Sequence, residues 1–189
     1  MMISMVFITA LCVACQPEPE PAQTVAFDLL DPRPVWIGEE LQFNTALHWR
    51  PDDEVVNALH HGVVIPLEVS VRISRHHGLV ASEDRSHHHR FEIRYLPLLR
   101  DYEVWDVRAD ERTLYPRLAI LTRALSRRRQ FSTGLSRSDV AERRWQVQLR
   151  AKLDRSRLPS PMRLPVWFDA RWRAEGPWHT WVFPSEEGG

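Results

Sequence analysis

Two stretches of alternating apolar and polar residues constrain the fold of this chain more than any other feature of its sequence. Between residues 65 and 95 the apolar positions of these stretches are all odd: Ile65, Leu67, Val69, Val71, Ile73, Phe91, Ile93 and Tyr95. A period of two residues is typical of β-strands that bury one face. We therefore expect residues 63–95 to form an antiparallel hairpin. Its apolar face stays continuous if Ile73 pairs with Phe91 and Val71 with Ile93.

The rest of the sequence predicts a mainly β domain with two short helices. Similar patterns predict strands over residues 25–29, 41–49, 102–107, 145–153, 164–168 and 178–182. Capping residues and apolar spacing predict helices over 53–61 and 113–125. We expect Asp31-Pro32-Arg33-Pro34 to end the first strand. Residues 131–142 are expected to form a polar loop that can include one helical turn. The fold class expected is an antiparallel sheet or β-sandwich with the helices packed on one side.

The order of segments predicts one exported domain. Residues 1–14 carry no charged side chain and resemble the apolar part of a signal peptide. Residues 15–24 form a tether rich in proline and glutamate. We expect a single β-rich domain over residues 25–184, because 189 residues suffice for one domain with a sizeable core, and a frayed tail over 185–189.

Cys15 is the candidate lipid-attachment residue. It follows small residues and precedes the tether, which resembles the pattern of bacterial lipoproteins. Cleavage after Ala14 and an uncleaved anchor are the alternatives. In each case the sequence predicts an exported protein of the periplasm that meets the membrane only through a signal anchor or a lipid.

Composition narrows the function classes. Its 25 basic residues balance 25 acidic ones, so nothing indicates a nucleic-acid partner. Cys12 and Cys15 are the only cysteines, which excludes thiol catalysis by the folded domain. Serine elbows and phosphate-binding glycine loops are absent from the sequence, and we expect neither enzyme activity nor a cofactor.

A group of histidines near the hairpin tip is the candidate metal site. In the expected register, His76 lies opposite His88 and His77 lies opposite His87. Imidazoles arranged in this way are ligands for zinc or copper. The alternative is a solvated hairpin tip. The arginine run 127–129, together with Arg143 and Arg144, is a candidate contact for anionic lipid or a partner, and the alternative is a solvated helix end.

Several motifs resemble one known family, the bacterial domain of unknown function 4390. They are Ala58-Leu59, Gly62-Val63, Pro66-Leu67, Leu153-Asp154, Leu158-Pro159-x-Pro161-Met162-Arg163-Leu164, Trp178 and Trp181. The resemblance spans Val25 to Phe183, and Met162 departs from the leucine usual in the family. It implies an exported envelope protein without established activity or catalytic residues. It also implies a gene context of sensor kinases and response regulators, which is an associational argument.

These observations favour a non-enzymatic binding or accessory protein of the envelope. The expected partner is an envelope protein, such as the sensor domain of a membrane kinase. The alternatives are a small-ligand or metal-binding envelope protein and an enzyme whose scattered site the sequence order conceals.

Overall fold

The described part of the chain folds into two antiparallel sheets. The computed structural model describes residues 26–77, 80–158, 172 and 174–183, and it describes only the backbone of Ala26, His76, His77 and residues 80–84. The predicted segments 1–14, 15–24 and 185–189 and the predicted strand 164–168 therefore lie outside the described residues. Among the helices of the described residues, none is long and apolar enough to span a membrane.

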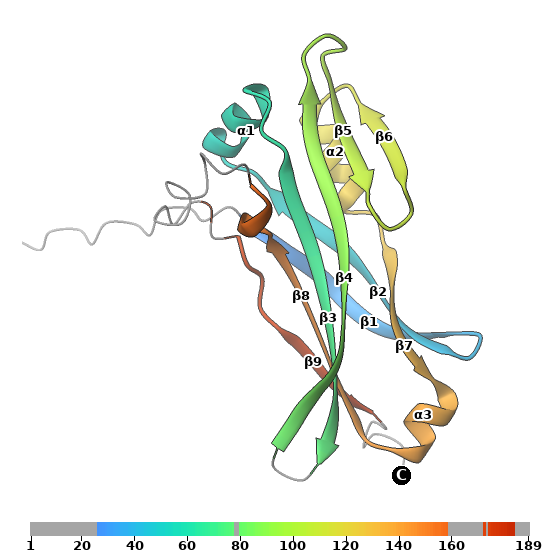
Figure 1. The fold of residues 1–189 in the computed structure, drawn as a ribbon. Coiled ribbons are helices and arrows are strands. Elements are labelled where there is room, and N and C mark those ends of the chain that lie inside the picture. The colour runs from blue at the N-terminus through green and yellow to red at the C-terminus, as the bar shows by residue number, and fades with distance from the viewer. Residues whose placement is uncertain (1–25, 78–79, 159–171, 173, 184–189) are drawn as a thin grey trace, which may run out of the picture.

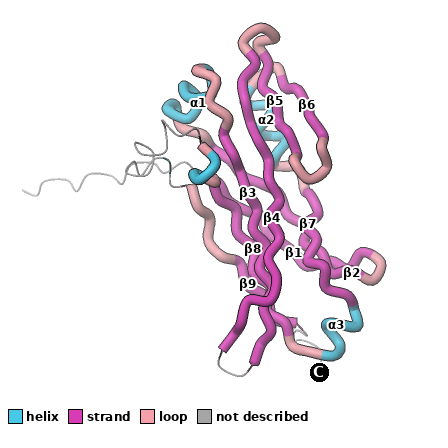
Figure 2. The backbone as a smooth tube through the Cα atoms, in the orientation of Figure 1, coloured by secondary structure: helices cyan, strands magenta, loops and turns pink. Residues whose placement is uncertain are grey.

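The smaller sheet has three strands and the larger has six (Figures 1 and 2). In spatial order, the smaller sheet contains β1 (Ala26–Ile37), β2 (Glu40–Arg50) and β7 (Arg129–Ser136). The larger sheet contains β6 (Glu111–Tyr115), β5 (Asp101–Asp106), β4 (Val80–Leu96), β3 (Ile65–His77), β8 (Trp145–Leu153) and β9 (His179–Phe183). The predicted mainly β class is confirmed.

Short helices lie near the ends of the sheets (Figure 2). α1 (Asp53–His60) agrees with the predicted first helix, and its N-cap, Asp52, accepts a hydrogen bond from Val55 N at 2.9 Å. α2 (Leu118–Leu125) buries Leu121 and Leu125. The structure adds a third helix, α3 (Arg137–Glu142), and a 3₁₀ turn, η1 (Arg155–Arg157).

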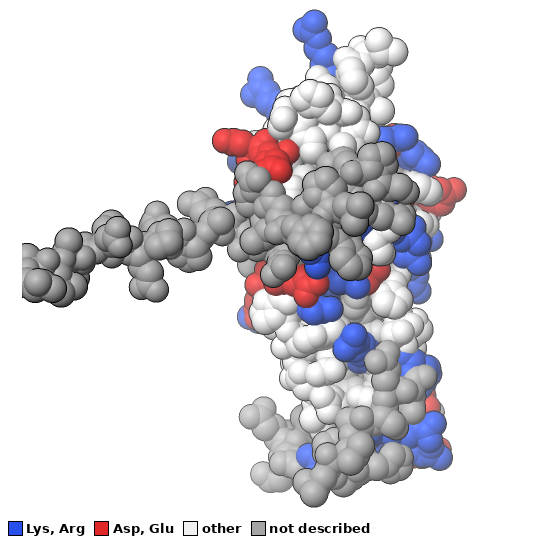
Figure 3. Space-filling model, turned by 60° about the vertical axis from the view of Figure 1, so that its left-hand side comes forward, with Lys and Arg blue, Asp and Glu red and all other residues white. Residues whose placement is uncertain are grey.

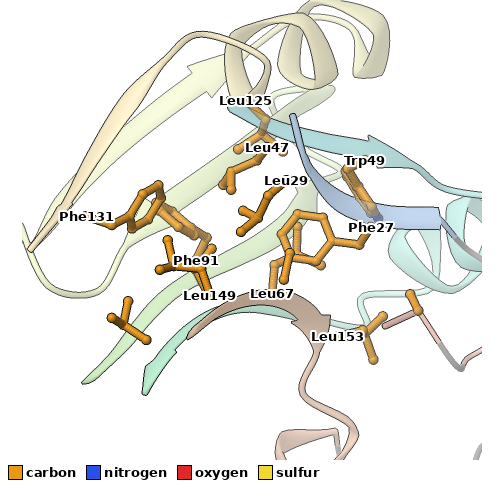
Figure 4. Packing of buried hydrophobic residues seen from close by; sticks show 14 of the residues in the cluster. Phe27, Leu29, Leu47, Trp49, Leu67, Phe91, Leu125, Phe131, Leu149 and Leu153 are labelled. Carbon is orange, nitrogen blue, oxygen red and sulfur yellow. The ribbon is translucent and has the colours of Figure 1, made fainter. Parts of the chain in front are cut away.

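The core lies between the two sheets and is filled by apolar side chains (Figure 4). The smaller sheet contributes Phe27, Leu29, Leu47, Trp49 and Phe131, and the larger contributes Leu67, Phe91, Leu149 and Leu153. Leu125 of α2 closes one end. Removal of these side chains from water is the main stabilising contribution.

The predicted end of the first strand is wrong. β1 continues through Pro32 and Pro34 to Ile37, with a register shift between Leu30 and Arg33. β1 is an edge strand, where a proline removes no hydrogen bond that the ladder needs. Asp31 takes a positive φ of 45° at the irregularity, and Arg128 Nη2 holds its carboxylate at 2.8 Å.

Two other local predictions are also wrong. The second helix begins at Leu118 instead of Thr113, because Glu111–Tyr115 pairs with β5 as an edge strand. The first part of residues 131–142 is not a loop, since β7 occupies it, whereas α3 lies in the part where the expectation allowed a helical turn. β7 buries alternate positions, but one of these is Thr133, which weakens the apolar pattern.

The predicted hairpin is confirmed, but its predicted register is wrong. Ile73 lies opposite Arg85, six residues before the expected partner Phe91, and pairing continues to His77 opposite Val80. The longer ladder satisfies backbone groups that a loop would leave to water. β8 also pairs along the other edge of β3, from Leu67 to Arg75. Because six is an even number, every inward side chain from Ile65 to Ile73 stays inward. Beyond Ile73 a β-bulge shifts the pairing by one residue.

Candidate functional site

The inward face of β4 changes character along its length. Tyr95, Ile93 and Phe91 belong to or pack against the apolar core, whereas the next inward positions are His89, His87 and Arg85. His88 lies on the opposite face, because successive residues of a strand point to opposite sides. The strand therefore divides three consecutive histidines between two environments.

The predicted pairing of the four histidines is wrong. His76 lies opposite Ala81 and His77 opposite Val80, while His87 and His88 lie opposite Val71 and Ser70. Six residues of β3 separate Ser70 from His76, about 20 Å at the usual rise of a strand. The side chains of His76 and His77 lie outside the described ones. Within the described residues no group of three or more His, Cys, Asp or Glu could hold a metal ion.

His89 lies where β4, β7 and the turn after β5 meet. Its side chain is 7% exposed, and its ring packs edge-on against Phe131 with 5.0 Å between ring centroids. Arg108 Nη1 lies 3.1 Å from Nε2 of the imidazole. Burial, and then the charge of Arg108, lower the pKa of His89 to about 4, although Asp106 acts in the opposite direction. The imidazole is therefore neutral at neutral pH.

His87 faces Gly134 of β7. Gly134 has a φ of 67°, and a Cβ atom at this position would lie 3.6 Å from His87 Nε2. This nitrogen is buried and has no hydrogen-bond partner within the described residues. Gly134 N and Ser132 Oγ donate to Glu40, and the bond from Ser132 holds the pKa of that carboxyl below its usual value. An ionised carboxylate therefore lies on β2 beside this part of β7.

Beyond His87 the inward positions line a pocket of about 400 Å³. Its walls come from β3, β4, β8 and the region of α3, with the residues Arg75, Arg85, Asp139, Glu142, Arg143 and Trp145. Three guanidinium groups, which donate hydrogen bonds and accept none, therefore lie around this pocket together with two carboxylates.

The outward face of β3 carries a separate buried carboxylate. Glu68 is 5% exposed and accepts hydrogen bonds from Ser70 Oγ at 2.7 Å and His88 Nδ1 at 2.8 Å. Lys152 Nζ lies 3.2 Å away. Burial alone would raise the pKa of Glu68, but the hydrogen bonds from Ser70 and His88 and the charge of Lys152 outweigh it and lower the pKa. This cluster joins β3, β4 and β8 on the outer side.

Sequence reasoning missed the pocket and the Glu68 cluster. Arg75 occupies the inward position directly after Ile73 on β3, and Arg85 occupies the inward position after His89 and His87 on β4. Trp145 begins β8 opposite Arg75. An arginine at a position that alternation places inward is a signal of a polar cavity or an open edge, and this signal was present in the sequence.

Comparison with known proteins gives one match. Residues 26–182 match a family model described as domain of unknown function (DUF4390). No curated protein and no solved structure matches the chain.

Proposed function

Because the chain belongs to the family described as domain of unknown function 4390, whose description names no reaction, we propose a function from the surface of the chain itself. In this proposal the protein is an exported, non-catalytic binding protein. Its partner in this proposal is another envelope protein, and the sensor domain of a two-component membrane kinase is the first one to test. The predicted signal segment and tether support export. The observation that carries the proposal is an exposed apolar end of the domain.

This apolar end consists of Leu98 and Leu99, with exposed fractions of 100% and 59%. Leu98 and Leu99 lie in the turn between β4 and β5, beside β6 and α2 at one end of the molecule (Figure 1). The surface there is mostly uncharged on the side that Figure 3 shows, with basic side chains beside it. Exposed apolar side chains grouped with a polar rim are typical of protein interaction sites.

The turn that presents these leucines has a defined conformation. Leu99 N donates to Leu96 O at 3.2 Å, and Pro97 restricts the backbone between them. Arg100 has a φ of 57°, which is unfavourable for a residue with a Cβ atom. The unfavourable φ of Arg100, next to the exposed Leu99, supports a functional role for this turn.

The charged residues around the apolar end indicate which surface to expect on the partner. Glu103 is held by Arg94 Nε at 2.6 Å and Arg112 Nη1 at 3.2 Å, beside Leu114 on the neighbouring strand. Arg100 and Arg117 are exposed at the same end. We therefore expect the partner to have an apolar patch with acidic residues at its rim.

Photo-crosslinking in cells tests this proposal. A photoreactive amino acid at position 98 should give an adduct with the kinase sensor domain or another envelope protein. The same amino acid at position 30, which is also exposed but lies on β1, should give none. Leu98→Ser with Leu99→Ser should weaken the binding of that purified partner at least tenfold, a loss of about 1.4 kcal/mol. Identical adducts at both positions, or no adduct at either, would refute the proposal.

A second candidate function, small-ligand binding, is favoured by the arginine-lined pocket near α3.

A further inference from the structure

The hairpin of β4 and β5 is fixed on its inner face by a cluster of rings directly below the turn. Tyr95 and Tyr102 pair across the two strands, one residue pair before the last, and their ring centroids lie 5.1 Å apart. His60 of α1 packs on Tyr95 with 4.6 Å between centroids, and its Nε2 lies 2.8 Å from the Tyr102 hydroxyl. Ring contacts of this kind add to the stability that burial provides, so the end of α1 holds the end of the hairpin in place.

The same hairpin is fixed on its outer face by ion pairs. Glu103 of β5 accepts hydrogen bonds from Arg94 Nε at 2.6 Å and from Arg112 Nη1 at 3.2 Å, so it joins β4, β5 and β6. Burial alone would raise the pKa of Glu103, but the two arginines outweigh it and lower the pKa. The guanidinium carbon of Arg112 also lies 4.1 Å from the ring centroid of Trp105. The turn therefore projects from a base that is held on both faces.

The side chains at the tip of this base project into solvent at one end of the molecule (Figure 1). Leu98 is 100% exposed, and Leu99 is also exposed. A flat partner surface would touch only the end of the Leu98 side chain, whereas a concave surface would remove all of it from water. Because the stabilisation gained is roughly proportional to the apolar area buried, two leucines contribute most when a concave surface encloses them.

We propose that Leu98 is a rigid anchor that inserts into a concave apolar socket of the partner protein, with Leu99 at the mouth of the socket. This inference rests on the proposed function and adds the shape of the partner surface. A turn that is already fixed loses little conformational entropy on binding. Arg100 is exposed beside Leu99, so carboxylates are expected at the rim of the socket.

A size series at position 98 tests the shape of the partner surface. The probe is the envelope protein that forms the adduct at position 98, purified and titrated by calorimetry. Leu98→Met conserves the volume and should change the Kd by less than about threefold. Leu98→Ala should weaken binding at least tenfold because it leaves the socket partly empty, and Leu98→Trp should do the same because the larger ring does not fit. Thermal unfolding should be unchanged in all three variants, because the replaced side chain is fully exposed.

The matched control is the pair of variants Leu30→Ala and Leu30→Trp. Leu30 is also exposed but lies on β1, so both variants should keep the wild-type affinity. If Leu98→Trp binds as tightly as the wild type, the contact is flat, and the socket is refuted while the proposed function stands. If no adduct forms at position 98, both are refuted.

Vesicles distinguish a protein socket from a lipid surface. Vesicles of phosphatidylcholine with phosphatidylglycerol should not bind the wild type. If they bind it, and Leu98→Trp strengthens this binding, the turn inserts into lipid, because tryptophan favours the membrane interface. That result would refute the socket.

Discussion

The two halves of the inward face of β4 show how one strand can serve both stability and binding. Phe91 and Ile93 are buried in the apolar core between the two sheets, and the guanidinium group of Arg129 lies over the ring of Phe91. Arg85, His87 and His89 continue the same row but meet β7 at the open edge of the sandwich. Polar side chains are tolerated at this edge because each of them can contact water, stay uncharged or form a hydrogen bond. The first half therefore carries stability, and the second can carry recognition.

The two halves should differ most in how much stability is lost when one side chain of each is truncated to alanine. Ile93→Ala removes a fully buried side chain and should lower the free energy of unfolding by about 2–5 kcal/mol. Arg85→Ala, in the same row, should change it by no more than about 0.5 kcal/mol because the side chain is exposed. Urea unfolding of both variants measures this contrast. Similar losses in the two variants would contradict the division of the strand.

Lowering the pH should destabilise the protein through His89, which belongs to the polar half. Its pKa is lowered to about 4, so the unfolded chain takes up the proton first, and stability falls as the pH drops from the unfolded value of 6.5 towards 4. Between pH 7 and 4.5 this one group should cost about 2 kcal/mol.

Variants of His89 separate its titration from its packing. Between pH 7 and 4.5, the free energy of unfolding of His89→Gln should fall less than that of the wild type, and the difference should equal the cost given above for His89. His89→Phe keeps a ring against Phe131 and should show the same flattening. Parallel pH profiles for the wild type and both variants would show that His89 does not titrate in this way.

A smaller effect is expected at the contact between the polar half and β7. Gly134→Ala places a Cβ atom at a φ of 67° and should cost about 1 kcal/mol in the free energy of unfolding. Gly134→Asn should cost less, because asparagine tolerates this backbone region better. Thermal unfolding compares the two variants. Equal stabilities for alanine and asparagine would mean that the backbone conformation is not the cause.

The sequence predicted more of the apolar half than of the polar half. Every inward residue predicted from Ile65 to Ile73 is buried, and α1 lies where Asp52 and the acidic first turn indicated. β7 was missed because its buried Thr133 interrupts the apolar pattern. The grouping of the histidines is wrong because the expected register places all of them near the tip of a shorter hairpin. In the structure His87, His88 and His89 lie within β4, and the alternation of the strand separates His88 from His87 and His89.

By itself, the sequence determined which faces of β3 and β4 are buried, because a two-residue period follows from local backbone geometry. Only the tertiary structure decided the register of the two strands, since sliding them by six residues leaves both faces unchanged. Packing of β4 against β7, through Arg85 with Gly134 and through His89 with Phe131, favours one register among these alternatives. That choice brings Arg75, Arg85 and Trp145 together in a pocket and leaves His76 and His88 far apart along the hairpin.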